Sequence, residues 1–113
     1  MRLWIDSFKA PTEYGRFWHN IKGYTWIRSV NDAKRVIYKN ETLRVPEPIH
    51  VIDLSCDAGV YRYDGGDYIE LLKWLESRGC NYPIFIHERW HPDVEKMKEI
   101  AHRNNWKCWY DWP

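Results

Sequence analysis

Two acidic residues and a histidine each follow an apolar run of this chain, and their side chains could carry acid–base chemistry. Asp6 follows "RLWI", Asp57 comes soon after "IHVIDL", and His87 follows "YPIFI". Histidine and carboxylate groups commonly act as the bases and acids of enzyme active sites. Each residue also has a simpler explanation: Asp6 could cap a turn, Asp57 could form an Asx-turn, and His87 could be a half-buried structural histidine. Their shared position after apolar runs favours a site, and we predict all three as its catalytic residues.

Five apolar or β-rich runs and three amphipathic segments must position these residues. The runs predict strands over 2–6, 24–29, 49–54, 83–87 and 106–112, and the amphipathic segments predict helices over 29–40, 66–79 and 92–105. Ser29 and Asp32 resemble a capping box at the start of the first helix, and Gly79 is expected to end the second. The predicted inward faces of the three helices are Val30, Ala33, Val36 and Ile37, then Tyr68, Leu71, Leu72 and Leu75, then Val94, Met97, Ile100 and Ala101.

The alternation of strands and helices predicts an α/β fold. Helices between consecutive strands favour right-handed crossovers, and hence a mostly parallel five-stranded sheet flanked by about three helices. Pro11, Gly15 and Gly23 interrupt residues 7–23, so we expect a long irregular loop between the first two strands. A chain of 113 residues with no repeat and no linker-like tract predicts a single domain over residues 1–113.

The ends of the predicted strands should meet at one edge of the sheet. In a parallel α/β sheet, ligands bind at the carboxyl ends of the strands, near the point where the strand order reverses. The first, third and fourth strands run into Asp6, Asp57 and His87, so these side chains are expected to converge on one crevice. The residues around them form the predicted ligand-binding set: Ser7, Ser55, Cys56, Gly59, Glu88, Arg89, Trp90 and His91.

Two other chemistries fit the same residues. A divalent metal ion could use carboxylate and imidazole ligands such as Asp6, Asp57, His87, Glu88 and His91. Alternation along a strand would direct His87 and Glu88 to opposite faces, so no cofactor is firmly predicted and a divalent metal stays an open alternative. Cys56 and His87 could form a nucleophile pair, although no local motif supports one.

The glycine pair at 65–66 lies ahead of a predicted helix. Backbone N–H groups at the start of a helix can hold a phosphate. Neither a P-loop pattern nor a G-x-G-x-x-G pattern occurs in the chain, however. Capping of the helix by Asp64 or Asp67 would explain the same residues, so the pair alone is weak evidence for a phosphate site.

Composition restricts the partners and the compartment. The formal net charge of +1 gives no electrostatic case for binding nucleic acid or a membrane surface. No apolar run is long enough to span a membrane, and none follows Met1 as a leader would. The three cysteines, Cys56, Cys80 and Cys108, lack metal-site spacing, and we expect reduced thiols in a cytoplasmic protein. The oligomeric state is not predicted.

Longer stretches of the chain resemble the cyclic-phosphate-processing receiver-like domain family. Members begin like "RLWID", carry "D-H-D-x-G" after the third strand, enter a helix through "G-G-D-Y", and carry "H-S-x-N-P-x-G" after the fourth strand. The matching stretches here are "DGGDYIELLKWLESRG", "YPIFIH" and "EKMKEIAHRNNWK". The resemblance implies a receiver-like (flavodoxin-like) fold and an activity on nucleotide or ADP-ribose cyclic phosphates. Phosphorelay signalling is rejected, because Ser7 replaces the second residue of an acidic pair and no lysine follows the fifth strand.

The chain departs from that family mainly at the site. "D-H-D-x-G" is replaced by residues 55–59, "SCDAG", and "H-S-x-N-P-x-G" by residues 87–93, "HERWHPD". We therefore expect a small nucleotide ligand and hold three interpretations open: a phosphoesterase, a catalytically weakened module that sequesters a nucleotide, and a redesigned scaffold with a new ligand. Loss of a carboxylate and a histidine lowers the rate of such a site strongly, whereas binding can survive it. Trp18, Tyr61 and Trp90 are expected near the rim, where aromatic rings could stack on a base.

Overall fold

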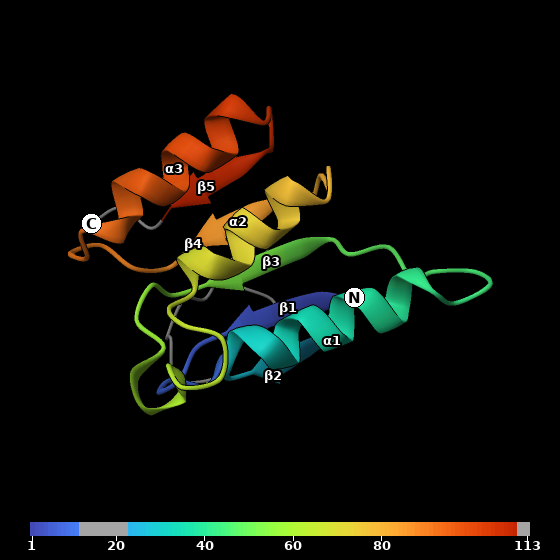
Figure 1. The fold of residues 1–113 in the computed structure, drawn as a ribbon, viewed down its shortest axis with the longest axis horizontal. Coiled ribbons are helices and arrows are strands. Elements are labelled where there is room, and N and C mark those ends of the chain that lie inside the picture. Colours follow the sequence, from blue (N-terminus) through green and yellow to red (C-terminus); the bar gives the residue numbers. More distant parts are fainter. Residues whose placement is uncertain (12–22, 111–113) are drawn as a thin grey trace.

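The protein is built on one parallel sheet. The computed structural model describes residues 1–11 and 23–110. The sheet has the order β2-β1-β3-β4-β5, and every pair of neighbouring strands is parallel (Figure 1). This confirms the predicted α/β fold, and the order is that of flavodoxin-like domains. The strands are β1 (Arg2–Ile5), β2 (Tyr24–Ile27), β3 (Val51–Leu54), β4 (Ile84–Ile86) and β5 (Cys108–Tyr110).

The helices agree with the predicted segments but are shorter. They are α1 (Val30–Glu41), α2 (Ile69–Ser77) and α3 (Asp93–Arg103), with a short 3-10 helix, η2 (Gly59–Tyr61), before α2. None of these helices combines the length and the apolar character needed to cross a bilayer. Residues 12–22 of the predicted irregular loop, including Trp18, lie outside the described residues, as do residues 111–113 at the end of the predicted fifth strand.

All three helices cover the same face of the sheet (Figure 1). The chain steps from β2 to β3, β4 and β5 in one direction across the sheet, and right-handed crossovers then place every intervening helix on one side. The predicted inward residues are buried there, except that Val36 is only partly buried. They pack against the alternate residues of the central strands: Leu3, Ile5, Ile52, Leu54, Ile84 and Ile86.

The opposite face of the sheet carries a row of aromatic residues interrupted by one acid. Strand register aligns Trp26, Trp4, Asp53, Phe85 and Trp109 across the five strands. Trp4 and Asp53 are fully buried, whereas the outer tryptophans are about half exposed. The indole of Trp4 donates a hydrogen bond to the carbonyl of residue 9, so the chain that leaves β1 folds across this face.

The start of α1 is fixed by the predicted cap and by an unpredicted partner. Ser29 is the N-cap, and its hydroxyl accepts from the backbone N–H of Asp32. The same hydroxyl donates to the carboxylate of Asp64 in the loop before α2, at 2.6 Å. Asp64 therefore stabilises the start of α1 and does not cap α2, contrary to one of the predicted alternatives.

The glycine pair allows this loop to approach α1 closely. Gly65 has a φ of +113°, and a Cβ atom there would lie 2.8 to 3.0 Å from atoms of Asn31 and Val30. Asp67 accepts from the backbone N–H of Ala58, and α2 begins without a side-chain cap. The packing of the loop thus accounts for the glycines without a phosphate.

Candidate functional site

A cleft of about 360 Å³ opens at the carboxyl ends of the strands. It lies where the strand order reverses between β1 and β3, which is the position at which open α/β sheets bind ligands. The predicted convergence of Asp6, Asp57 and His87 on one crevice is present. The lining residues are Asp6, Ser7, Phe8, Lys9, Ser55, Asp57, Gly59, His87 and Glu88.

Two larger hollows lie away from this edge of the sheet. One runs along α3 and β5 and includes Lys98, Trp106 and Cys108. The other runs along β2 and α1 and includes Trp26 and Arg28, whose guanidinium lies 4.0 Å from the indole ring. We place the candidate site at the smaller cleft, because it lies at the strand-order reversal and collects side chains from three strand ends.

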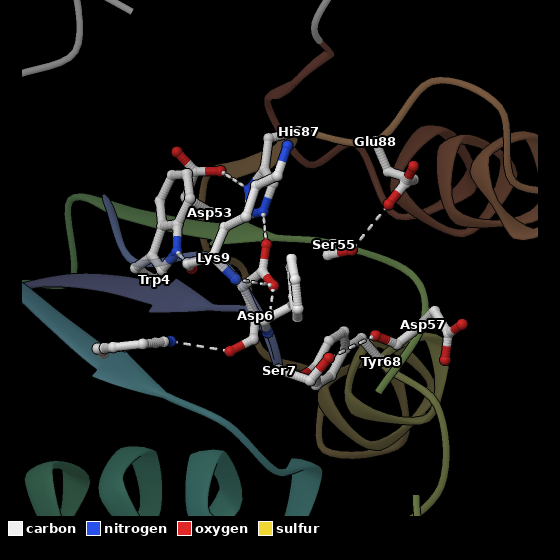
Figure 2. A network of polar contacts seen from close by, with 12 residues as sticks. Trp4, Asp6, Ser7, Lys9, Asp53, Ser55, Asp57, Tyr68, His87 and Glu88 are labelled. Carbon is white, nitrogen blue, oxygen red and sulfur yellow. Dashed lines mark hydrogen bonds and ion pairs between the residues drawn. The ribbon is translucent and has the colours of Figure 1, made fainter. Parts of the chain in front are cut away.

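The central feature of the cleft is a histidine held between two carboxylates (Figure 2). Nδ1 of His87 lies 2.6 Å from Oδ1 of Asp53, and Nε2 lies 2.8 Å from Oδ2 of Asp6. His87 follows β4, Asp53 belongs to β3, and Asp6 follows β1, so the imidazole links three adjacent strands. The three residues are nearly inaccessible to solvent.

Aromatic groups enclose this cluster on the side away from the helices. The indole of Trp4 stacks on the imidazole of His87, with ring centroids 4.0 Å apart and planes 3° from parallel. Tyr24 meets the same indole edge-on and hydrogen-bonds Asp53, and burial raises the pKa of Tyr24 to about 12. An aromatic face stabilises a cation that lies against it, so the stacking favours a protonated His87.

The hydrogen bonds define the charge of the cluster. A carboxylate only accepts hydrogen bonds, so both ring nitrogens of His87 must carry protons to bond Asp53 and Asp6. Burial alone would lower the pKa of His87, but the hydrogen bonds to Asp53 and Asp6 and the negative charges of these residues together outweigh it and raise the pKa above its usual 6.5. Burial would likewise raise the pKa of Asp6, but hydrogen bonds from His87 and from the backbone N–H groups of Phe8 and Lys9 lower it below 3.8. The cluster is an imidazolium between two carboxylates.

Asp57 lies in the same cleft but has different partners. Its carboxylate accepts from Nη2 of Arg62 at 2.7 Å and from the backbone N–H of Gly59 at 2.7 Å. Within the described residues it has no hydrogen bond to His87. The carboxylate of the predicted catalytic Asp57 is therefore compensated by an arginine rather than coupled to the histidine, and Asp53 is a direct partner of His87.

Glu88 and the two serines complete the polar lining. The hydroxyl of Ser55 donates to Oε2 of Glu88 at 2.9 Å, which fixes the carboxylate of Glu88 across the cleft from the β1 end (Figure 2). The hydroxyl of Ser7 donates to the backbone carbonyl of Asp57 at 3.2 Å. Gly59 approaches Ser7 closely, since a Cβ atom there would lie 3.1 Å from its hydroxyl oxygen.

The remaining predicted ligand-binding residues lie elsewhere. The thiol of Cys56 faces the core, 3.6 Å from the sulfur of Met97, and burial raises its pKa. Arg89 and Trp90 are exposed beyond the end of β4, with Trp90 86% exposed, and neither lines the cleft. His91 accepts from the backbone N–H of Asp93 at the start of α3. Tyr61 borders the hollow beside β2 and α1.

The divalent-metal alternative gains no support from the described residues. Among residues 1–11 and 23–110, no three histidine, cysteine or acidic side chains form a metal-binding group. The expected separation of His87 and Glu88 onto opposite faces is wrong, because β4 ends at Ile86 and both residues line the cleft. Strand alternation does not extend into the loop that carries them.

Sequence reasoning missed the residues that act from within the strands. The sequence patterns place Asp53 within the third predicted strand and do not assign Trp4 of β1 to the site. Lys9, in the loop that follows β1, is missed as well. A signal for two of them is present, since Trp4 and Asp6 share one side of β1 and Asp53 and Ser55 share the matching side of β3. Applied strictly, the same alternation places Cys56 on the core side with Leu54.

The fold and the cleft together define a flavodoxin-like α/β domain with a polar site at its strand-order reversal. Comparison of the chain with protein-family models, curated proteins and solved structures finds no match in any of the three. The family resemblance therefore stays an expectation drawn from the sequence, and the function must be argued from the site.

Proposed function

We propose that the cleft binds a small nucleotide ligand that carries a cyclic phosphate and holds it without hydrolysing it. The ligand class is the one implied by the sequence resemblance. The position of the cleft at the carboxyl ends of β1, β3 and β4 supports a ligand site there.

The observation that carries the proposal is the engagement of both ring nitrogens of His87. Opening a cyclic phosphate requires a base to take a proton from water and an acid to protonate the leaving oxygen. His87 donates from Nδ1 to Asp53 and from Nε2 to Asp6, so it has no lone pair for a proton from water. Its protons also point at carboxylates rather than at a leaving group.

Asp6 is equally unsuited to proton transfer in this arrangement. One of its oxygens accepts from His87, and the other accepts two backbone N–H groups at 2.8 and 2.9 Å. These hydrogen bonds stabilise the charged form of Asp6 and lower its pKa, so Asp6 is a weak base near neutral pH. The two residues best placed for catalysis therefore stabilise each other.

The cleft retains groups that suit a phosphate and a base. Lys9 lines the cleft and forms no ion pair within the described part of the chain, so its ammonium can pair with a singly charged cyclic phosphate. Arg62 pairs with the carboxylate of Asp57, and the charge of His87 offsets one of the two carboxylates that flank it, which reduces the repulsion of an anion. Phe8 is 83% exposed at the mouth of the cleft and offers a face for a base.

Equilibrium dialysis against a panel of cyclic nucleotides and ADP-ribose cyclic phosphate tests the proposal. Lys9→Ala should weaken binding by about tenfold or more, because it removes a charge-assisted contact. Lys107→Ala is the matched control and should bind like the wild type. Lys107 is exposed and comes directly before β5, at the edge of the sheet away from the cleft. Absence of binding to every ligand of the panel, or equal effects of the two variants, would refute the proposal.

Hydrolysis of the same ligand is the second candidate. It is favoured by the presence of Asp6, Asp57 and His87 along one cleft, as the sequence predicted. It requires ligand binding to displace His87 from Asp6, because only then does Nε2 face the ligand. Steady gain of one water by the ligand, lost in His87→Ala, would establish this candidate over simple binding.

A further inference from the structure

We infer that Glu88 is the residue that selects the sugar, and that the cleft takes ribonucleotides with a free 2′-hydroxyl, as in 3′,5′-cyclic nucleotides. The inference rests on the proposed function, because it assumes that the cleft binds a nucleotide. It adds the class of nucleotide that the cleft binds and the side chain that contacts its sugar.

Glu88 differs from the other carboxylates of the cleft in its partners. Asp6 accepts from His87 and two backbone N–H groups, and Asp57 accepts from Arg62 and Gly59. Glu88 accepts a single hydrogen bond, from Ser55 to its Oε2. Within the described residues no cation pairs with Glu88, so Oε1 and the remaining lone pairs of Oε2 can accept from a ligand.

The chemistry of that acceptor identifies the ligand group. A carboxylate without a cation repels a phosphate and accepts from a hydroxyl, and acidic residues bind the ribose 2′-hydroxyl in other nucleotide sites. The described residues around Glu88 do not form a metal-binding group, so a bound cation does not explain it. A nucleotide also carries N–H donors on its base, but the 2′-hydroxyl is the neutral donor that all four ribonucleotides share, so it is the group that we assign to Glu88.

The positive Lys9 and the negative Glu88 lie at the ends of different strands of the cleft. Lys9 follows β1 and Glu88 follows β4, and β3 lies between these strands. Two strand spacings separate the ends of β1 and β4 by roughly 10 Å, so Lys9 and Glu88 can contact different groups of one small ligand. The phosphate would lie toward Lys9 and Ser7, and the 2′-hydroxyl toward Glu88.

Ser55 makes Glu88 a fixed acceptor. Ser55 is 6% exposed, and its backbone N–H donates to the carbonyl of Ile5, so its hydroxyl has a defined position. A carboxylate held by such a neighbour loses less freedom on binding than a free one. A ligand with a 2′,3′-cyclic phosphate has no free 2′-hydroxyl and would place its charge against Glu88.

The test compares 3′,5′-cyclic phosphates of adenosine, guanosine, cytidine and uridine with their 2′-deoxy counterparts and with the 2′,3′-cyclic isomers. Isothermal titration on the wild type should show a preference for the ribose form of about tenfold to a hundredfold. Glu88→Ala should remove that preference, and Glu88→Gln, which keeps an acceptor oxygen, should retain part of it. Unchanged urea midpoints would show that both variants fold.

The outcomes separate this inference from the proposed function. Equal binding of ribose and deoxyribose forms by the wild type overturns the inference and leaves the proposed function standing. A preference that persists in Glu88→Ala, or binding restricted to 2′,3′-cyclic isomers, does the same. Absence of binding to every nucleotide tested overturns the inference, and absence of binding to ADP-ribose cyclic phosphate as well overturns the proposed function.

Discussion

Substitution of Asp53 by asparagine should destabilise the protein far more than its conservative chemistry suggests. Asparagine has the same shape and keeps an oxygen for Nδ1 of His87, but it removes one of the two negative charges that flank a buried imidazolium. Hydrogen bonds to charged groups contribute about 1.5–3 kcal/mol, and breaking a buried pair outright costs about 3–5 kcal/mol. We expect Asp53→Asn to lower the free energy of unfolding by about 2–3 kcal/mol at pH 6.

Asp57→Asn is the matched control, because it also neutralises a carboxylate at the end of β3. Asp57 and its partner Arg62 have side chains 52% and 57% exposed, and pairs this exposed contribute little to stability. Both variants would be unfolded with urea at pH 6 and at pH 9. If Asp53→Asn loses no more stability than Asp57→Asn, the buried pair of Asp53 with His87 does not stabilise the fold as expected.

The pH dependence of the Asp53→Asn effect has a defined sign. The pKa of His87 is raised in the folded protein above its usual 6.5. The stability gained from its protonation is fully present below pH 6.5 and is lost as pH rises through the higher folded value. Without the charge of Asp53 the pKa of His87 falls, so the difference between wild type and variant should shrink from pH 6 to pH 9. A difference that stays constant would contradict a charged His87.

Three further predictions concern the stability of the fold around the cleft, and each is measured by urea unfolding. His87→Gln should abolish the loss of wild-type stability above pH 6.5, and a variant that keeps this slope would assign it to another group. Gly65→Ala should lower the free energy of unfolding by about 3 kcal/mol, because φ is positive there and the added Cβ atom would collide with α1. Gly79→Ala, where φ is also positive but the space is open, should lower it by about 1 kcal/mol. Equal losses in the two variants would exclude the collision. Tyr68→Phe should cost about 1–2 kcal/mol, since its hydroxyl donates to the carbonyl of residue 28 at 2.6 Å, and an unchanged midpoint would show that this bond is dispensable.

Local patterns in the sequence predicted the scaffold well. The inward faces of α1, α2 and α3 follow from a helical period of 3.6, and Val30, Leu71 and Met97 are buried as expected. The convergence of Asp6 and His87 follows from the geometry of parallel strands, because all their carboxyl ends meet at one edge. These inferences require only short-range periodicity and the direction of the strands.

The partners within the site could not be predicted in the same way. Asp53 and His87 are 34 residues apart, and Ser29 and Asp64 are 35 apart, so their pairing depends on strand register and loop path. Local motifs offer Asp64 or Asp67 as the cap of α2, whereas the tight approach at Gly65 brings Asp64 to α1. The charge of His87 likewise depends on two carboxylates from other strands.

The central claim is that the cleft holds a cyclic-phosphate nucleotide and leaves it intact. The most direct measurement is mass spectrometry of the cyclic-phosphate panel after incubation with excess protein, before and after heat removal of the protein. We expect one ligand to disappear from the ultrafiltrate of native protein and to return with unchanged mass after heating. A ligand that returns with the mass of one added water, or a panel that is never depleted, would contradict it.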